Sequence, residues 1–241
     1  NILNIRNMKH QIKNLVVSTI LLTACASANA QTFLYDGLWF DIESDETCIL
    51  RSTWIGPKYS GDIIVPEKAI YDGKEYTVTK TLGAFWRCDE LTSVSLPETI
   101  TTIGDQSFEN CKKLHTLKIP NSVTYIGSYA FNECNALTGI TIPEGVTVIG
   151  RSAFRHCDNI TSVNIPNGIK YLDYATFAGC GKLTSINLPN SLTHIGESAF
   201  SACRFTSITI PASVDSLGNY AFTSCEWLTE INLDHISKIG R

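Results

Sequence analysis

Residues 183–203 read LTSINLPNSLTHIGESAFSAC, and close variants of this string return along most of the chain. The pair Phe-x-x-Cys marks each return, and successive pairs lie 23 residues apart five times and 22 residues apart once. Seven in-phase copies predict a repeat architecture, in which each unit contacts only its neighbours. The marks are Phe85/Cys88, Phe108/Cys111, Phe131/Cys134, Phe154/Cys157, Phe177/Cys180, Phe200/Cys203 and Phe222/Cys225.

One unit predicts two short strands and a turn. Residues 183–188 alternate in hydrophobicity as a strand does, and Pro189 ends it because proline donates no ladder hydrogen bond. Residues 192–195 read as a second short strand with Gly196 as the turn after it, and residues 199–203 read as one helical or 3₁₀ turn. A single unit buries too few apolar side chains to offset the entropy of ordering it. We therefore expect stacked coils, ~4.8 Å apart, that share one core.

This unit resembles the BspA-like, or treponemal-type, leucine-rich repeat. The resemblance is close over residues 85–233 and reaches back to about Gly61. It implies a leucine-rich-repeat solenoid of the α/β horseshoe class, dominated by β structure, with about seven 23-residue coils and an N-terminal β-hairpin cap. Two departures predict local kinks. Asp173 and Thr176 stand where Gly and Ala usually sit, and the seventh unit is one residue short near Arg204.

The N-terminal segment reads as an export signal. We expect residues 1–30 to be a signal peptide that starts at Met8, with basic residues before an apolar run too short to span a bilayer. Two cleavage sites compete. A cut after Ala30 suits ordinary signal peptidase and gives a soluble protein, whereas residues 22–25 resemble a lipobox and would leave a lipid anchor on Cys25. The sequence leaves both open.

Two further regions follow the signal peptide. We expect residues 31–81 to form an N-terminal β cap, in which Asp72-Gly73 is a strong hairpin turn signal and Trp39 and Trp54 cover the first coil. Residues 82–241 are expected to form the solenoid. The last unit stops before its Ala-Phe-x-x-Cys segment, so we expect the solenoid to be truncated at its C-terminus.

Composition narrows the choice of partners. The chain is 44% hydrophobic and 17% charged, with a formal net charge of −4. Lys and Arg form no stripe, and nucleic acid and anionic membrane surfaces both require clustered cations. We therefore expect neither as a partner. After the signal peptide, no run approaches the ~18 apolar residues of a membrane span.

The residues that carry chemistry are scattered or belong to the repeat. In-register cysteine side chains run parallel, which holds their Cβ atoms beyond the usual disulfide range, so we expect a buried column of free thiols. Zinc sites need closely spaced ligands, and the sequence offers none. His156 beside Cys157 reads as a surface histidine next to a core thiol, because the histidine does not repeat. We predict no enzyme activity, no metal site and no cofactor.

Alternation within the first strand identifies its outward residues. We call this set the polar strip. It reads either as a solvated sheet face or as an extended docking surface. Its members are Ser93, Ser95, Thr116, Lys118, Thr141, Ser162, Asn164, Ser185, Asn187, Ser207 and Thr209.

The second strand offers a rival surface, which we call the tyrosine row. Tyrosine is enriched at protein interfaces. Tyr129 and Tyr220 lie nearby in the repeat. The expected members of the row are Thr102, Tyr125, Val148, Tyr171, His194 and Ser216.

The residues alone predict an exported, non-enzymatic interaction scaffold. The resemblance implies more, namely a bacterial cell-surface protein of the adhesin type that binds proteins of the host matrix or of other cells. Two alternatives remain open. One is a structural spacer that presents a missing C-terminal domain, and the other is an accessory protein that captures glycans or peptides.

Overall fold

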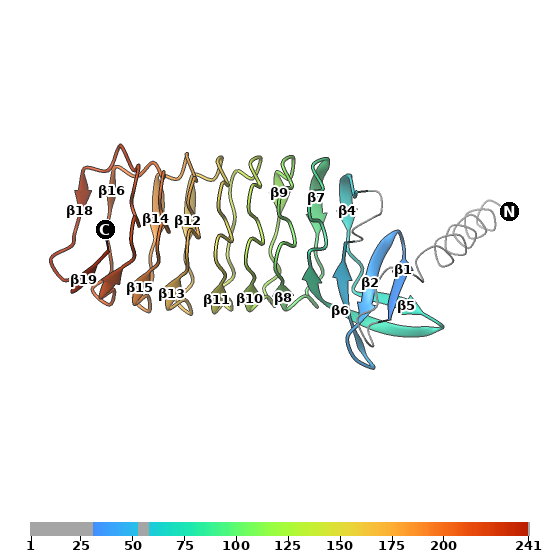
Figure 1. Cartoon of the computed structure of the whole chain (residues 1–241). Helices are drawn as coiled ribbons and strands as arrows, with labels where there is room; N and C mark the ends of the chain where they lie inside the picture. The colour runs from blue at the N-terminus through green and yellow to red at the C-terminus, as the bar shows by residue number, and fades with distance from the viewer. Residues whose placement is uncertain (1–30, 53–57, 241) are drawn as a thin grey trace.

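The described residues form one row of stacked coils. The computed structural model describes residues 31–52 and 58–240, and within them it has strands and turns but no helix. Figure 1 shows the coils side by side, with short strands along two sides and a group of longer strands at the N-terminal end. This is the β-dominated solenoid that the 23-residue period predicts.

Each coil contributes to one or both of the two strand rows. The first row consists of β4 (Gly61–Ile64), β7 (Leu91–Ser95), β9 (Thr116–Leu117), β12 (Ser162–Asn164), β14 (Ser185–Asn187), β16 (Ser207–Ile208) and β18 (Glu230–Ile231). The second row consists of β6 (Lys74–Leu82), β8 (Thr102–Ile103), β10 (Tyr125–Ile126), β11 (Val148–Ile149), β13 (Tyr171–Leu172), β15 (His194–Ile195), β17 (Ser216–Leu217) and β19 (Lys238–Ile239). At the N-terminal end lie β1 (Thr32–Tyr35), β2 (Leu38–Ile42), β3 (Thr47–Arg51) and β5 (Lys68–Tyr71).

Neighbouring coils pair in parallel and in register. Ser162 pairs with Ser185 in the first row, and Tyr125 pairs with Val148 in the second. The strands are shorter than the sequence predicts, because the chain bends after two or three paired residues to close each coil. Equivalent residues therefore stack directly above one another, which makes every outward position a row of side chains along the solenoid.

The segment Ala-Phe-x-x-Cys is not the helical or 3₁₀ turn that we predicted. Each coil has two residues with positive φ here, such as Ser198 at 56° and Ala202 at 57°. Alternate backbone N–H groups bond within the coil and to the next coil. The Cys203 N–H donates to the Phe200 carbonyl at 3.3 Å, whereas the Phe200 N–H donates to Ala221 at 2.9 Å. Bonding between coils thus offsets the cost of left-handed residues other than glycine.

The core is a continuous stack of phenylalanine rings. Ring centroids of successive coils lie 5.1–5.9 Å apart from Phe85 to Phe222, with interplanar angles of 2–22°. Six of the seven rings are fully buried. Each buried ring stabilises the fold by roughly 1.5–3 kcal/mol relative to an exposed one, and the stacked geometry repeats because the units are in register.

The repeat cysteines form the predicted column of free thiols. All eight cysteines among the described residues are unpaired. The thiol of each repeat cysteine from Cys111 onward donates to the carbonyl oxygen of a phenylalanine in the preceding coil, at 3.1–3.3 Å. Cys48, which lies in β3 at the N-terminal end, is also buried and unpaired.

The N-terminal end is built from antiparallel strands that continue into the second row. β1, β2 and β3 pair in order, β3 pairs with β6, and β5 pairs with β6. The predicted hairpin joins β5 to β6, with positive φ at both Asp72 and Gly73 as a type I′ turn requires. Trp54 lies outside the described residues. The ring packed edge-on against Phe85, at 5.5 Å, is Tyr59, which the sequence analysis did not single out.

The second row breaks where Asp173 replaces the usual glycine. One sheet ends at β11 and another starts at β13. Glycines at the equivalent position approach the preceding coil so closely that a Cβ on Gly196 would lie 2.7 Å from the Leu172 carbonyl oxygen. Asp173 carries a Cβ at this position, and the ladder of the second row is interrupted in the same coil.

Candidate binding surfaces

The side chains of the polar strip face outward as alternation predicts. Ser162, Asn164, Ser185 and Asn187 are exposed, and Ser93 is half-buried. The strip follows the first strand row along most of the solenoid. Its positions are therefore fixed by the parallel pairing of the coils rather than by contacts among the side chains themselves.

Polar groups of the strip bond to each other or to side chains beside the strip. The Asn187 amide donates to the Asn164 oxygen at 2.7 Å, one coil away. Both Ser93 and Thr92 donate to the carboxylate of Asp62, at 2.6 and 2.8 Å. These bonds, first from Ser93 and then from Thr92, lower the pKa of Asp62. Groups that are already bonded within the strip have fewer free donors and acceptors for a partner.

The tyrosine row presents larger and less satisfied side chains. Tyr125 pairs with Val148, and Tyr171 pairs with His194 across the next ladder. The exposed fractions are 37% for Tyr125, 44% for Val148 and 63% for Tyr171. His194 is half-buried, and its Nδ1 lies 2.8 Å from the Ser216 hydroxyl. Partial burial, followed by the Asp105 carboxylate, raises the pKa of Tyr125 and keeps its phenol protonated as a donor.

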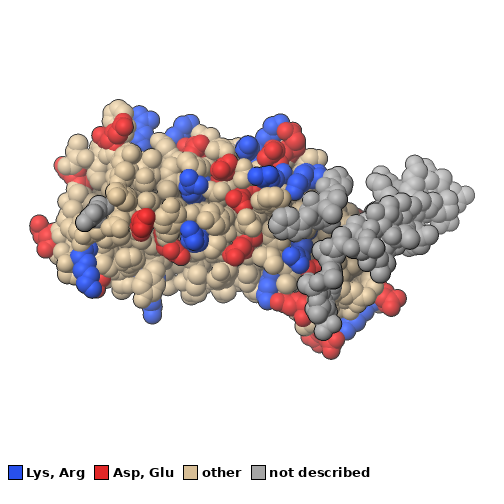
Figure 2. All heavy atoms as spheres, in the orientation of Figure 1, with Lys and Arg blue, Asp and Glu red and all other residues tan. Residues whose placement is uncertain are grey.

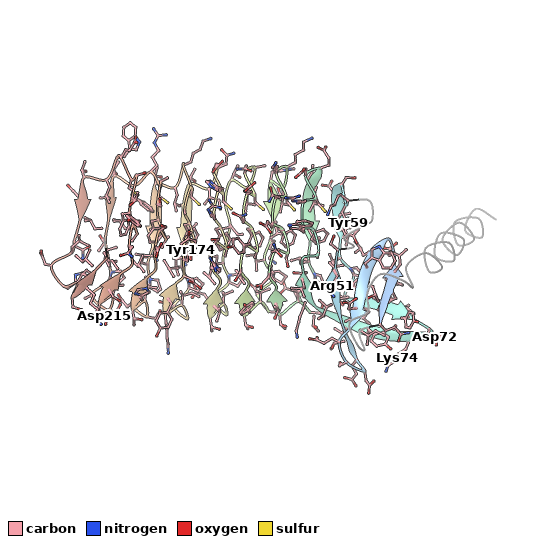
Figure 3. The ribbon with its side chains drawn as sticks, viewed as in Figure 1. Arg51, Tyr59, Asp72, Lys74, Tyr174 and Asp215 are labelled. Atoms are coloured by element: carbon pink, nitrogen blue, oxygen red, sulfur yellow. The ribbon has the colours of Figure 1, made fainter. Side chains whose placement is uncertain are left out.

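An arginine joins two further tyrosines beside this row. The Arg151 guanidinium lies over the ring of Tyr129 at 5.8 Å and over the ring of Tyr174 at 5.2 Å. Tyr174 is 41% exposed and is labelled near the middle of the solenoid in Figure 3. We call the combined surface the tyrosine patch. Its members are Tyr125, Tyr129, Val148, Arg151, Tyr171 and Tyr174.

The sequence analysis missed Arg151 and Tyr174 in this patch. Both occupy the same position of the repeat, which follows Gly150 in one coil and Asp173 in the next. This position carries no repeated residue type, so the motif does not point to it. Writing the coils in columns of 23 residues would have placed Arg151 directly before Tyr174 in one column, with Tyr129 in the neighbouring column.

The buried thiols do not supply reactive nucleophiles. Burial raises the pKa of Cys134 and of Cys180 to about 12, and raises those of Cys111, Cys157 and Cys203 as well. The thiolate is the nucleophilic form, so buried protonated thiols are inert. Within residues 31–52 and 58–240, no three histidine, cysteine or acidic side chains converge in a way that would hold a metal ion.

His156 has a structural setting. Its Nδ1 lies 3.8 Å from a carboxylate oxygen of Asp158, whose other oxygen accepts a hydrogen bond from Asn135 at 2.7 Å. The imidazole also occupies the space that a Cβ on Gly179 would need, and Gly179 has a φ of 76°. Ring and glycine thus pack against each other, as expected of a surface histidine beside a core thiol.

Charges are mixed over the solenoid surface. Figure 2 shows acidic and basic side chains interspersed on the face in view, with tan surface between them. Some salt bridges join neighbouring coils, as between Lys113 and Glu90 at 2.7 Å. On this face the surface presents no continuous basic track of the kind that a nucleic acid backbone requires.

The repeat can now be compared with known proteins. The family model described as the BspA type leucine rich repeat region matches residues 81–203 and 147–241, with six copies. This chain belongs to the BspA type leucine-rich repeat family. The resemblance inferred from the motifs is therefore confirmed, and the family suggests a binding scaffold of the bacterial surface. No curated protein matches the chain.

Solved structures extend the comparison. A leucine rich cell surface protein from Faecalibacterium prausnitzii is 32% identical with a TM-score of 0.75, and the match covers 86% of this chain and 55% of that one. A leucine-rich repeat protein from Eubacterium ventriosum is 25% identical with a TM-score of 0.61, over 83% and 51% of the two chains. This chain thus spans about half the length of either protein.

Some predictions concern residues that the structure does not describe. The signal peptide and Cys25 lie within residues 1–30, outside the described part of the chain. In the part that is described, there is no helix of the length and hydrophobicity that a membrane crossing requires.

Proposed function

We propose that this chain is an exported, non-enzymatic binding scaffold, an adhesin-type protein of the bacterial surface that docks partner proteins through the tyrosine patch. The observation that carries the proposal is the run of exposed Tyr125, Val148 and Tyr171 in three consecutive coils, with Arg151 between two more tyrosines beside it. Tyrosine and arginine dominate the energetics of protein interfaces.

The patch combines the properties that such an interface needs. Tyrosine rings offer a large apolar contact with a polar tip, at a low cost in conformational entropy. The strand pairing of Tyr125 with Val148, and of Tyr171 with His194, fixes the backbone that carries these rings before any partner arrives, which reduces the ordering cost of binding. Arg151 adds donors that are held in place by Tyr129 and Tyr174.

The polar strip supports a weaker case. Its asparagine, serine and threonine side chains are small, Asn187 already bonds to Asn164, and Ser93 bonds to Asp62 beside the strip. A partner that docks there would exchange existing hydrogen bonds for new ones with little net gain. The strip therefore serves as the control surface in the test of the proposal.

The test is surface plasmon resonance of the chain over immobilised collagen, laminin and fibronectin. We expect saturable binding to a matrix protein, weakened at least tenfold by Tyr125→Ala/Tyr171→Ala, because truncated interface tyrosines cost more than ~1 kcal/mol each. The matched control, Ser162→Arg/Ser185→Arg, introduces two bulky cations on the strip and should leave binding within twofold.

Two results would overturn the proposal. One is a folded, monomeric sample that binds none of the matrix proteins. The other is binding that the strip variant abolishes while the tyrosine variant leaves it intact. Circular dichroism of both variants establishes that each retains the fold, which is expected because all four substituted side chains are exposed.

A further inference from the structure

The short coil has a different backbone path at its outer bend. Elsewhere the residue three positions after the repeat cysteine donates its N–H back to that cysteine, as Leu183 does to the Cys180 carbonyl at 2.9 Å. In the short coil only Arg204 separates Cys203 from Phe205. The Arg204 N–H instead donates to the Leu183 carbonyl of the preceding coil at 3.0 Å.

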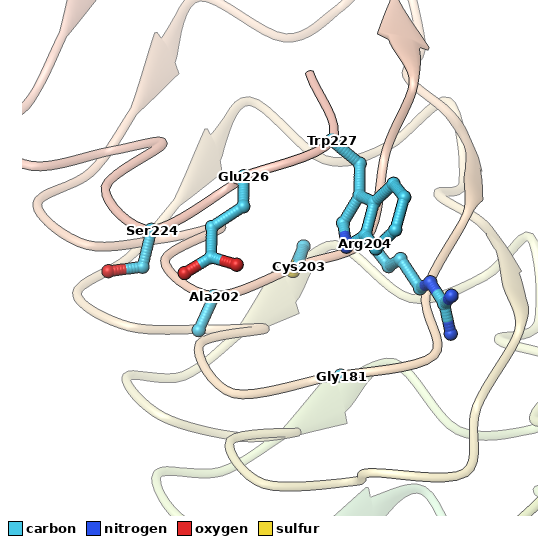
Figure 4. A pocket seen from close by; sticks show the side chains of 7 residues that line it. All are labelled: Gly181, Ala202, Cys203, Arg204, Ser224, Glu226 and Trp227. Atoms are coloured by element: carbon cyan, nitrogen blue, oxygen red, sulfur yellow. The ribbon is translucent and has the colours of Figure 1, made fainter.

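The core of the short coil is fully packed although the coil lacks one residue, and the surface of the coil has a hollow. Phe205 takes the position of the repeat leucine, is fully buried and meets Phe200 edge-on at 5.7 Å. Outside it, the bend recedes between its two neighbours and leaves an open pocket of about 370 Å³. Figure 4 shows the residues that line it, which are Gly181, Ala202, Cys203, Arg204, Ser224, Glu226 and Trp227.

The lining combines an exposed aromatic plane with opposite charges. Trp227 is 55% exposed even though the Arg204 guanidinium lies over its ring at 5.0 Å. In Figure 4, Ser224 and Glu226 lie on one side of Cys203, and Arg204 and Trp227 lie on the other. Arginine only donates hydrogen bonds, the glutamate carboxylate only accepts them, and serine does both.

This chemistry selects among ligand classes. One positive and one negative charge cancel across the pocket, so an anion meets repulsion from Glu226 and a cation meets it from Arg204. A neutral ligand that donates and accepts at neighbouring atoms can satisfy both side chains. A pyranose ring has such hydroxyl pairs and also an apolar C–H face that can stack on an indole.

We propose that this pocket binds one pyranose unit of a neutral glycan, stacked on the face of Trp227 that the Arg204 guanidinium leaves open, with Arg204, Glu226 and Ser224 bonded to ring hydroxyls. The volume lies at the small end of the ~300–1,000 Å³ range of ligand pockets, which suits a single sugar ring. The pocket opens to solvent, so the rest of a chain can continue on either side. This site is separate from the tyrosine patch and does not depend on it.

A glycan array of the full chain tests the proposal. The probes are neutral glucan, mannan, xylan, galactan and N-acetylglucosamine oligomers, with sialylated and sulfated oligosaccharides beside them. We expect binding to a neutral series, with at least a tenfold loss of affinity in Trp227→Ala. Glu226→Gln should weaken binding severalfold, since the amide replaces one acceptor by a donor.

A second variant fills the pocket without removing any lining group. Gly181→Leu suits this purpose, because a Cβ on Gly181 meets no atom within 4 Å and its φ is not positive. We expect at least a tenfold loss of glycan affinity in Gly181→Leu and no change in Tyr125→Ala/Tyr171→Ala. Titration of the free oligosaccharide, compared with an intact and a deglycosylated glycoprotein, distinguishes the two sources of the sugar.

Three outcomes would overturn the proposal. They are the absence of binding to any neutral oligosaccharide, unchanged affinity in Gly181→Leu, and a preference for sialylated or sulfated sugars. Each is independent of matrix-protein binding, so failure of the glycan site leaves the adhesin proposal standing, and the reverse also holds.

Discussion

The polar strip follows the first strand row and the tyrosine row follows the second strand row of the same coils, and their side chains make different contacts. In the strip the side chains are small and polar, and Asn187 bonds to Asn164 of the neighbouring coil. In the row, Tyr125, Val148 and Tyr171 extend into solvent with apolar area that no neighbouring side chain covers. The period of 23 residues therefore fixes where outward side chains lie, while their size and hydrogen bonding decide which surface suits a partner.

Their backbones differ as well. Gly139 takes the coil position between Thr116 and Ser162 of the strip, and an added Cβ there would meet nothing within 4 Å. Beside the tyrosine row, the turn glycines touch the preceding coil, and Gly196 donates to the Leu172 carbonyl at 2.8 Å. Tight backbone packing thus supports the row, and the strip tolerates substitution.

The largest expected effect is a loss of the free energy of unfolding of the whole solenoid, which carries both surfaces. It acts through the column of buried cysteine thiols. Burial raises the pKa of Cys134 and Cys180 from 9.0 to about 12. Because these thiols stay protonated in the folded chain and ionise in the unfolded one, their contribution to stability is complete below pH ~9. It is lost as the pH rises toward 12, by about 1.4 kcal/mol per thiol per pH unit.

Urea denaturation between pH 8 and pH 11 measures this loss. Tyrosine and lysine also ionise there, so the matched control is Cys157→Ala, which removes one buried thiol and keeps the other titrating groups. Its free energy of unfolding should fall less steeply with pH than that of the parent, by about one thiol's share. Equal slopes in the two proteins would contradict the account of the thiol column.

A smaller effect separates the two surfaces. In Gly196→Ala the new Cβ would lie 2.7 Å from the Leu172 carbonyl oxygen and 2.8 Å from the carbonyl carbon of Asp173. We expect a loss of about 1–3 kcal/mol, the usual cost of overpacking, together with weaker matrix-protein binding because the ladder that places Tyr171 is displaced.

The matched control for this substitution lies on the strip. Gly139→Ala adds the same methyl group where nothing obstructs it and where φ is not positive. It should be neutral or stabilise the fold by up to ~1 kcal/mol, since alanine reduces the entropy of the unfolded chain. If thermal denaturation showed the same loss in the free energy of unfolding for both variants, the difference in backbone packing between the two surfaces would not affect stability.

Much of this architecture follows from the sequence alone. The 23-residue period gives the solenoid, the alternation within 183–188 gives the outward rows, and Asp72-Gly73 gives the type I′ hairpin. Each of these depends on contacts within one unit or between equivalent residues of adjacent units. Such contacts repeat with the motif, so the motif reveals them.

The remaining features depend on residues that do not repeat. In the turn segment, residues such as Gln106 and Glu133 have positive φ although they are not glycines, so the sequence does not predict this conformation. Hydrogen bonds between coils override the local backbone preference. Arg151 finds Tyr129 and Tyr174 only once the coils are stacked. The pocket lies at the coil that lacks one residue. The sequence predicts a kink at that coil but does not predict which side chains meet there.

The smallest expected effect concerns the strip alone. Asn164 and Asn187 are directly opposite each other on adjacent strands and share a hydrogen bond of 2.7 Å between exposed side chains. Cross-strand pairs of this kind contribute roughly 0.2–1 kcal/mol. We expect Asn187→Ala to cost no more than that, and to leave matrix-protein binding unchanged.

A double-mutant cycle of Asn164→Ala and Asn187→Ala isolates the interaction from the intrinsic effect of each substitution. A coupling free energy within that range would mean that the strip's amides are occupied by each other, which is why the surface offers a partner little. Zero coupling, with binding reduced by either single variant, would mean that these amides face a ligand instead. The strip would then replace the tyrosine patch as the docking surface, because free amides in a row every ~4.8 Å form a regular hydrogen-bonding template.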